Sequence, residues 1–153
     1  MFIAHDPDGK LFQRAADALM RYHFYPESLM HYVSDFSREN RWLRVGNRLV
    51  QRIHAFRLLG LPILDAITMN EIYAVSDEPR RKGFTYVTTQ AHSERGEWSP
   101  AVEWRDNGDL YLTIHVLSRL AYDVSPFQLR RIRRLQTGAH HQGIEAFKRR
   151  VLS

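Results

Sequence analysis

The chain of 153 residues contains no cysteine. This absence excludes disulfides, thiolate metal sites and cysteine nucleophiles, and it fits a reducing compartment. Long apolar runs are also missing, because the longest apolar block, Leu58 to Ile67, is broken by Gly60, Pro62 and Asp65. A membrane span needs about 18 uninterrupted apolar residues, so the sequence predicts no transmembrane segment. The beginning of the chain lacks the apolar core of a secretory signal, and the simplest expectation is a cytoplasmic protein.

Acidic residues are scarce towards the C-terminal end of the sequence. Between Ser125 and Ser153 there are seven arginines and lysines against one acid, Glu145, so this segment carries a net charge of +6. The whole chain carries +5, which leaves the remainder at −1. Positive charge that is concentrated in one segment favours a single local contact with an anionic partner over a protein that binds nucleic acid across its whole surface.

The remaining composition is that of an ordinary globular protein, with 44% hydrophobic and 25% charged residues. A chain of this length buries a sizeable core without disulfides or metal ions. Internal repeats and long linkers are absent from the sequence. We therefore expect residues 1–153 to form a single domain.

The chain begins and ends with helical periodicity. Apolar residues at spacings of three and four predict a helix over Lys10–Tyr22, and Pro26 in a first helical turn predicts a shorter helix over Pro26–Phe36. Pro126, with Ser125 as N-cap, opens a long helix that continues to the C-terminal end. Glycine weakens a helix by about 1 kcal/mol relative to alanine, so the two glycines inside it mark a bend or a place of close packing.

The middle of the chain alternates between apolar and polar residues, as strands do. Asn107-Gly108 is a strong hairpin signal, because both residues tolerate the positive φ angles of tight turns. Helices, then consecutive strands, then a long helix is an α+β order with an antiparallel meander. Strands are predicted over Arg48–Phe56, Ile63–Val75, Gly83–Gln90, Glu97–Arg105 and Leu110–Ser118.

One segment resembles a known family signature. Gly83–Glu97 is similar to the Gly-Phe-x-Tyr-x-Thr-x-x-x-His-x-x-x-Gly-Glu stretch of the family catalogued as domain of unknown function nineteen-ninety. The likeness extends through Asp106–Arg119, the helix around Leu129-Arg130-Arg131, and Tyr22–Pro26. The resemblance implies no established activity and no cofactor. The chain departs from the family pattern at Glu71, Ala91, Trp98, Pro100 and Leu120.

The strands followed by one long helix also resemble the helix-grip fold of START and Bet v 1-like proteins. That resemblance implies a curved antiparallel sheet of about five or six strands that wraps the C-terminal helix, with one or two N-terminal helices. It further implies an apolar cavity that holds a small apolar or lipid-like ligand. For the polar residues among those expected to line the cavity, the alternative is that they are ordinary strand residues facing solvent. The residues expected to line the cavity are Phe84, Tyr86, Thr88, Trp98, Tyr111, Thr113, His115, Ser118 and Arg119.

His92 and Glu97 form the most interesting polar pair. They flank the short segment Ser93–Gly96, so they are placed to face each other across a hairpin. A carboxylate that orients a histidine makes a general acid/base unit, which would indicate an enzyme of the cyclase or hydrolase kind. The alternative is a hydrogen bond that only fixes the turn.

Other candidate sites are weaker. Ser118-Arg119 suggests a nucleophile and an anion clamp, but no base lies near it in the sequence, and a strand-end salt bridge is the ordinary interpretation. His140 and His141 are adjacent, so on a helix they point about 100° apart and cannot chelate together. We therefore predict no metal site.

The basic run of the last helix suggests a partner of opposite charge. Nucleic acid and an anionic membrane surface are the two candidates, and a solvated helix face is the ordinary alternative. An RNA-binding domain would also show a known module or exposed aromatic side chains, and the sequence identifies neither. The residues of the run are Arg130, Arg131, Arg133 and Arg134.

Overall fold

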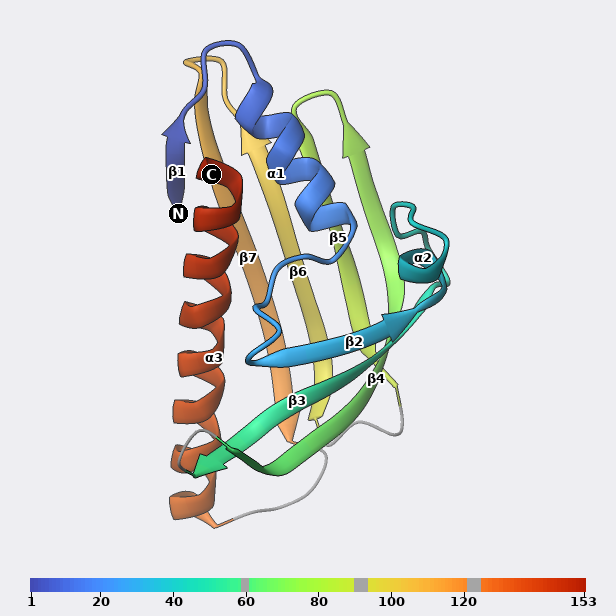
Figure 1. Ribbon diagram of the computed structural model, residues 1–153, viewed down its shortest axis with the longest axis vertical. Coiled ribbons are helices and arrows are strands. Elements are labelled where there is room, and N and C mark those ends of the chain that lie inside the picture. Colours follow the sequence, from blue (N-terminus) through green and yellow to red (C-terminus); the bar gives the residue numbers. More distant parts are fainter. Residues whose placement is uncertain (59–60, 90–93, 121–124) are drawn as a thin grey trace.

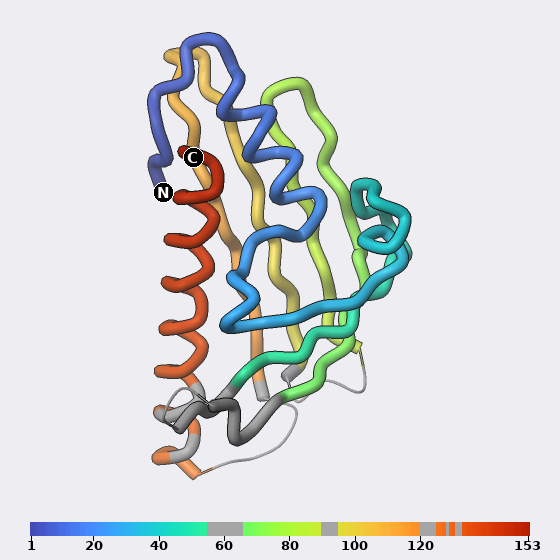
Figure 2. Tube along the Cα trace, viewed as in Figure 1, coloured from blue at the N-terminus to red at the C-terminus, as the bar shows by residue number. Residues whose placement is uncertain are grey.

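The computed structural model describes the chain except for residues 59–60, 90–93 and 121–124 and several side chains beside them (Figure 2). Seven antiparallel strands form one sheet in the order β1-β7-β6-β5-β4-β3-β2. The strands are β1 (Phe2–His5), β2 (Met30–Ser34), β3 (Arg48–Leu58), β4 (Leu61–Glu78), β5 (Arg81–Thr88), β6 (Glu94–Trp104) and β7 (Asp109–Leu120). The helices are α1 (Lys10–Met20), α2 (Asp35–Arg38) and α3 (Pro126–Leu152).

The sheet is strongly curved. Figure 1 shows α1 and α3 on the same face of β5, β6 and β7, while β2, β3 and the first half of β4 run across the direction of those strands. The pairing of β4 with β5 shifts in register between Ile72 and Ala74, and such irregularities bend a strand. We call the face towards α1 and α3 the inner face, and the opposite face the outer face.

Cross-strand pairing assigns side chains to the two faces. Trp98 pairs with Tyr86 on β5 and with Val116 on β7, and partners in a sheet share a face. The Trp98 ring lies 5.1 Å from the ring of Phe24, which stacks at 5.4 Å on Phe147 of α3. All three paired residues therefore lie on the inner face, and their neighbours along each strand lie on the outer face.

The core is densest where α1 covers the inner face. Phe12 stacks on Trp104 with ring centroids 6.1 Å apart, and Arg14 donates a hydrogen bond to the carbonyl oxygen of Val151 at 3.0 Å. The second contact joins α1 to the end of α3. Completely buried apolar side chains in this region are Ala15, Ala16, Leu19, Val102, Leu110, Phe147 and Val151.

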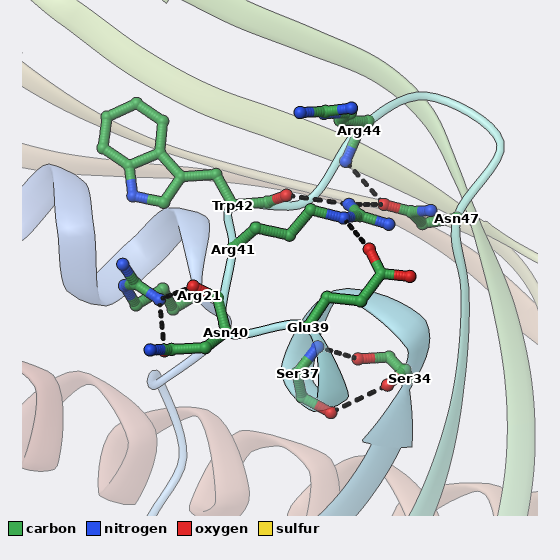
Figure 3. A network of polar contacts seen from close by, with 9 residues as sticks. All are labelled: Arg21, Ser34, Ser37, Glu39, Asn40, Arg41, Trp42, Arg44 and Asn47. Atoms are coloured by element: carbon green, nitrogen blue, oxygen red, sulfur yellow. Dashed lines mark hydrogen bonds and ion pairs between the residues drawn. The ribbon is translucent and has the colours of Figure 1, made fainter.

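A polar network holds the loop between α2 and β3 against the end of α1 (Figure 3). Asn47 Oδ1 accepts hydrogen bonds from the backbone N–H of Arg44 at 2.8 Å and from Arg41 Nη1 at 3.0 Å. Arg21 Nη1 donates to the carbonyl oxygen of Asn40 at 2.8 Å and to its side-chain oxygen at 2.7 Å. These contacts fix the end of α1 next to Tyr22. Tyr22 lies at the centre of the candidate site.

The structure confirms the α+β class, the antiparallel meander and the C-terminal helix that begins at Pro126. The predicted helix over Pro26–Phe36 is wrong, since this segment forms a turn, then β2, and then the single turn α2. Met30 and Ser34 are buried while His31 and Val33 are exposed, and this alternation is that of an edge strand.

The predicted count of five or six strands is also corrected to seven. The strands that the sequence did not reveal are the two short edge strands, β1 and β2. Among the described residues, no helix is both long enough and apolar enough to cross a membrane.

Candidate functional site

Tyr22 takes an unusual backbone conformation at the centre of the inner face. Its φ angle is 64°, in the left-handed region, directly after α1. The Tyr22 N–H donates to the Leu19 carbonyl at 2.9 Å and the His23 N–H to the Ala18 carbonyl at 2.8 Å, as in a Schellman motif. Glycine is favoured here, and a bulky residue costs about 1–2 kcal/mol. Contacts made by the Tyr22 side chain must offset that cost.

Aromatic rings surround Tyr22. Its ring centroid lies 5.1 Å from Tyr32, 5.9 Å from Phe84, 6.4 Å from Tyr86 and 6.3 Å from Trp98. The Tyr22 side chain is only 2% exposed. The family-like segment Gly83–Glu97 therefore contributes Phe84 and Tyr86 to a cluster whose centre comes from the end of α1.

Buried polar side chains continue inward from the Tyr22 hydroxyl. Gln51 Nε2 donates to that hydroxyl, and Gln51 Oε1 accepts from Thr68 Oγ1 and from Asn70 Nδ2, each at 2.9 Å. Gln51, Thr68 and Asn70 are all at least 97% buried. We call these four residues the polar cluster.

Two polar atoms beside this cluster have no partner among the described residues. They are the Asn70 Oδ1 acceptor and the Trp98 Nε1 donor. Each belongs to a residue that is at most 3% exposed. Leaving such a group unsatisfied costs about 1–3 kcal/mol.

Burial falls along the inner face from one end to the other. On β7, Leu112 is 1% exposed, whereas Val116 is 51% exposed. On α3, Phe147 is 0% exposed, whereas Leu129, five helical turns earlier on the same side, is 38% exposed. The interior is filled at the closed end, around Leu112 and Phe147. It is less covered at the open end, where Val116 and Leu129 are exposed and Ser118 is half-buried.

The first half of α3 is tied to this open end. Arg133 Nη1 donates to Ser118 Oγ and Arg133 Nη2 to the Ser118 carbonyl, both at 3.1 Å. Gln136 Oε1 accepts from Arg133 Nη1, also at 3.1 Å. One turn further along, the His140 ring lies 6.5 Å from the Trp98 ring. The first half of α3 thus lies beside the open end.

Two of the hollows that described residues line lie elsewhere than between the inner face and α3. One, of about 130 Å³, lies on the outer face around Thr85 and Ser99. The other, of about 350 Å³, lies between Pro26 and the solvent side of α3 at His141 and Arg149. Among the described residues, no three histidine or acidic side chains gather closely enough to hold a metal ion.

A family model described as "Domain of unknown function (DUF1990)" matches residues 3–146. The chain belongs to the DUF1990 family. The match confirms the likeness seen in Gly83–Glu97. No curated protein and no solved structure matches the chain. The comparison with START and Bet v 1-like proteins therefore stays a prediction.

The DUF1990 fold divides the predicted pocket residues between the two faces. Phe84, Tyr86, Thr88, Trp98 and Ser118 lie on the inner face, as the pairing of β5, β6 and β7 requires. Thr88 accepts a hydrogen bond from the Gly96 N–H at 3.0 Å. The outer face carries the other four, Tyr111, Thr113, His115 and Arg119, which we leave out of the candidate site.

The predicted acid/base pair is only partly described. His92 lies outside the described residues. Glu97 is exposed and pairs with Leu117 and Val87 on the outer face, away from the polar cluster. The structure therefore does not bring Glu97 to the inner face.

Sequence reasoning missed the polar cluster. Gln51 falls on the otherwise apolar side of the predicted strand Arg48–Phe56, and Thr68 and Asn70 interrupt the apolar run of Ile63–Val75. A polar residue in an apolar register is a signal for a buried hydrogen-bond group. Nothing in the local sequence shows that these positions meet Tyr22, which comes from another part of the chain.

Burial changes the proton affinity of groups in this DUF1990 domain. Burial raises the pKa of the Tyr22 and Tyr25 hydroxyls well above the usual value, and the neighbouring Tyr86 adds to both shifts. Burial also lowers the pKa of His140, with a smaller effect from His141. The site therefore presents neutral donors and acceptors rather than charges.

The lowered pKa of His140 predicts a loss of stability in acid. The unfolded chain takes up a proton on this histidine at about pH 6.5 and the folded chain only at a lower pH, so the stabilising contribution is present above about pH 6.5 and is lost as the pH falls. His23, whose pKa is lowered by burial and by Arg150 and Arg21, acts in the same direction. Urea unfolding at about pH 7 and pH 5 should show a smaller acid loss for His140→Gln than for the wild type. An unchanged acid loss in His140→Gln, equal to that of His141→Gln, would contradict this assignment.

Proposed function

We propose that this chain binds a small, mostly apolar molecule at the open end, between the inner face of β6 and β7 and the first half of α3. The observation that supports the proposal is the exposure of Val116. It is an apolar inner-face residue next to the buried Trp98, and it is half uncovered although α3 lies beside it. Covering apolar surface of this kind contributes about 25 cal/mol per Å².

The unpartnered polar atoms indicate how such a ligand would be oriented. Trp98 Nε1 can donate a hydrogen bond and Asn70 Oδ1 can accept one, and because both atoms are buried, a ligand would reach them only after neighbouring side chains move aside. A mostly apolar site uses a few directed polar groups of this type to fix the ligand. The ligand that fits best is an apolar molecule with a neutral polar group, such as a hydroxyl or an amide, which enters polar end first.

Native mass spectrometry of the protein purified from its own host tests this proposal. We expect a population heavier than the bare 18.1 kDa chain, with the added mass of a small organic molecule that is lost on denaturation. Incubation with a lipid extract of the host should increase that population. Spectra that contain only the bare chain before and after incubation would contradict the proposal.

A further inference from the structure

Four arginines lie around the open end of the molecule. Arg95 and Arg119 are direct cross-strand partners on β6 and β7, and both are exposed. Arg130 and Arg134 are exposed on α3, which has no acidic residue before Glu145. Within the described part of the chain, none of these four arginines forms an ion pair.

The pairing of Arg95 with Arg119 is unfavourable by itself. Like charges directly opposite each other in a sheet destabilise the pair. Glu97, which lies on the same face two residues from Arg95, makes no ion pair with either arginine. An external anion would relieve this repulsion.

Large apolar side chains are exposed among these arginines. Leu117 is 70% exposed, Phe127 73% and Leu135 51%. Single exposed apolar residues are common on proteins, but here three of them share one end of the molecule with the unpaired positive charges. We call Leu117, Phe127, Leu135 and the four arginines the basic apolar patch; Leu117, Arg95 and Arg119 belong to the outer face of the sheet, and the other members belong to α3.

Helix geometry places part of this patch away from the core. Phe127, Arg130 and Arg134 are spaced by three and four residues, so they lie on one side of α3. Phe147, which faces the core, lies on the other side of the helix, about 160° away from Phe127. The start of α3, the end of β7 and the end of β3 lie at the same lower end of Figure 1.

We propose that the basic apolar patch docks on an anionic lipid bilayer. Arginine guanidinium groups pair with lipid phosphates, and Phe127 with the leucines would enter the boundary between headgroups and acyl chains. Aliphatic side chains such as Leu117 and Leu135 have no corresponding role on nucleic acid, where stacking of aromatic rings and phosphate contacts dominate. This proposal does not depend on a ligand at the open end.

Co-sedimentation with vesicles tests the docking. The protein should bind vesicles of phosphatidylcholine mixed with phosphatidylserine at low salt, and it should not bind pure phosphatidylcholine. One basic residue near an anionic surface changes partitioning about fivefold, so Arg130→Gln with Arg134→Gln should weaken binding about 25-fold. Arg149→Gln with Arg150→Gln, at the other end of the same helix, is the matched control and should leave binding nearly unchanged.

The apolar part of the patch has its own control. Phe127→Ser should weaken vesicle binding, whereas Tyr73→Ser, at an outer-face aromatic that is 67% exposed, should not. Equal weakening by both arginine pairs, or by both aromatic changes, would overturn the proposal. So would binding to duplex DNA that depends on Arg130 and Arg134 without any binding to the mixed vesicles.

Discussion

Replacing Gln51 with leucine should destabilise the protein by about 2–4 kcal/mol, because two buried groups lose their partner at about 1–2 kcal/mol each. The groups are the Thr68 hydroxyl and the Asn70 amide, whereas the Tyr22 hydroxyl keeps its hydrogen bond with Tyr86. Leucine has nearly the same volume as glutamine, so the change creates little cavity. A domain is stabilised by only about 5–15 kcal/mol, so urea unfolding should show a large shift.

Thr68→Val is the matched control for this experiment. It keeps the shape of the side chain and removes a single hydrogen bond to Gln51, so it should cost about 1 kcal/mol. A Gln51→Leu variant that is no less stable than Thr68→Val would show that water replaces the lost partners. The polar cluster would then contain bound water, and it would not be a water-free part of the core.

Replacing the two glycines of α3 with alanine, one at a time, should change the stability of the protein in opposite directions. A Cβ at Gly143 would lie 2.6 Å from Phe24 Cε1 and 2.7 Å from Tyr25 Cε1, while a Cβ at Gly138 would meet nothing within 4 Å. Overpacking costs about 1–3 kcal/mol, and this exceeds the roughly 1 kcal/mol that alanine contributes to a helix. We expect Gly143→Ala to destabilise the protein and Gly138→Ala to stabilise it by up to about 1 kcal/mol.

Thermal unfolding measures both glycine variants. A change of 1 kcal/mol shifts Tm by about 2–4 °C for a domain of this size, so the two variants should move in opposite directions. If both substitutions raised Tm by the same amount, Phe24 and Tyr25 would not be packed against α3 as described.

Much of the fold could be predicted from the sequence because its signals are local. The alternation over Leu110–Ser118, the Asn107-Gly108 turn and Pro126 each fix an element through nearby residues. The segment Pro26–Phe36 was mistaken because Pro26 begins a turn, and because β2 is specified by its pairing with β3, for which the local sequence carries little signal. Tertiary pairing outweighs local propensity in short edge strands.

The candidate site was harder to predict for the same reason. Phe84, Tyr86 and Trp98 could be identified because they are aromatic residues on strands that the local sequence predicts. The polar cluster draws Tyr22 from the end of α1, Gln51 from β3 and Asn70 from β4, and these approach only when the sheet curls. The face of β7 that points inward also depends on register, which a one-residue shift would reverse.

The most direct test of the open end is a titration with N-phenylnaphthylamine, a neutral dye that fluoresces in apolar surroundings. We compare the wild type with Val116→Trp, which fills the inner face, and Leu117→Trp, which places the same ring on the outer face. We expect Val116→Trp to raise the dye Kd at least about tenfold, a change of about 1.4 kcal/mol, while Leu117→Trp leaves it nearly unchanged. Equal Kd values for both variants, or no dye binding by the wild type, would contradict ligand binding at the open end.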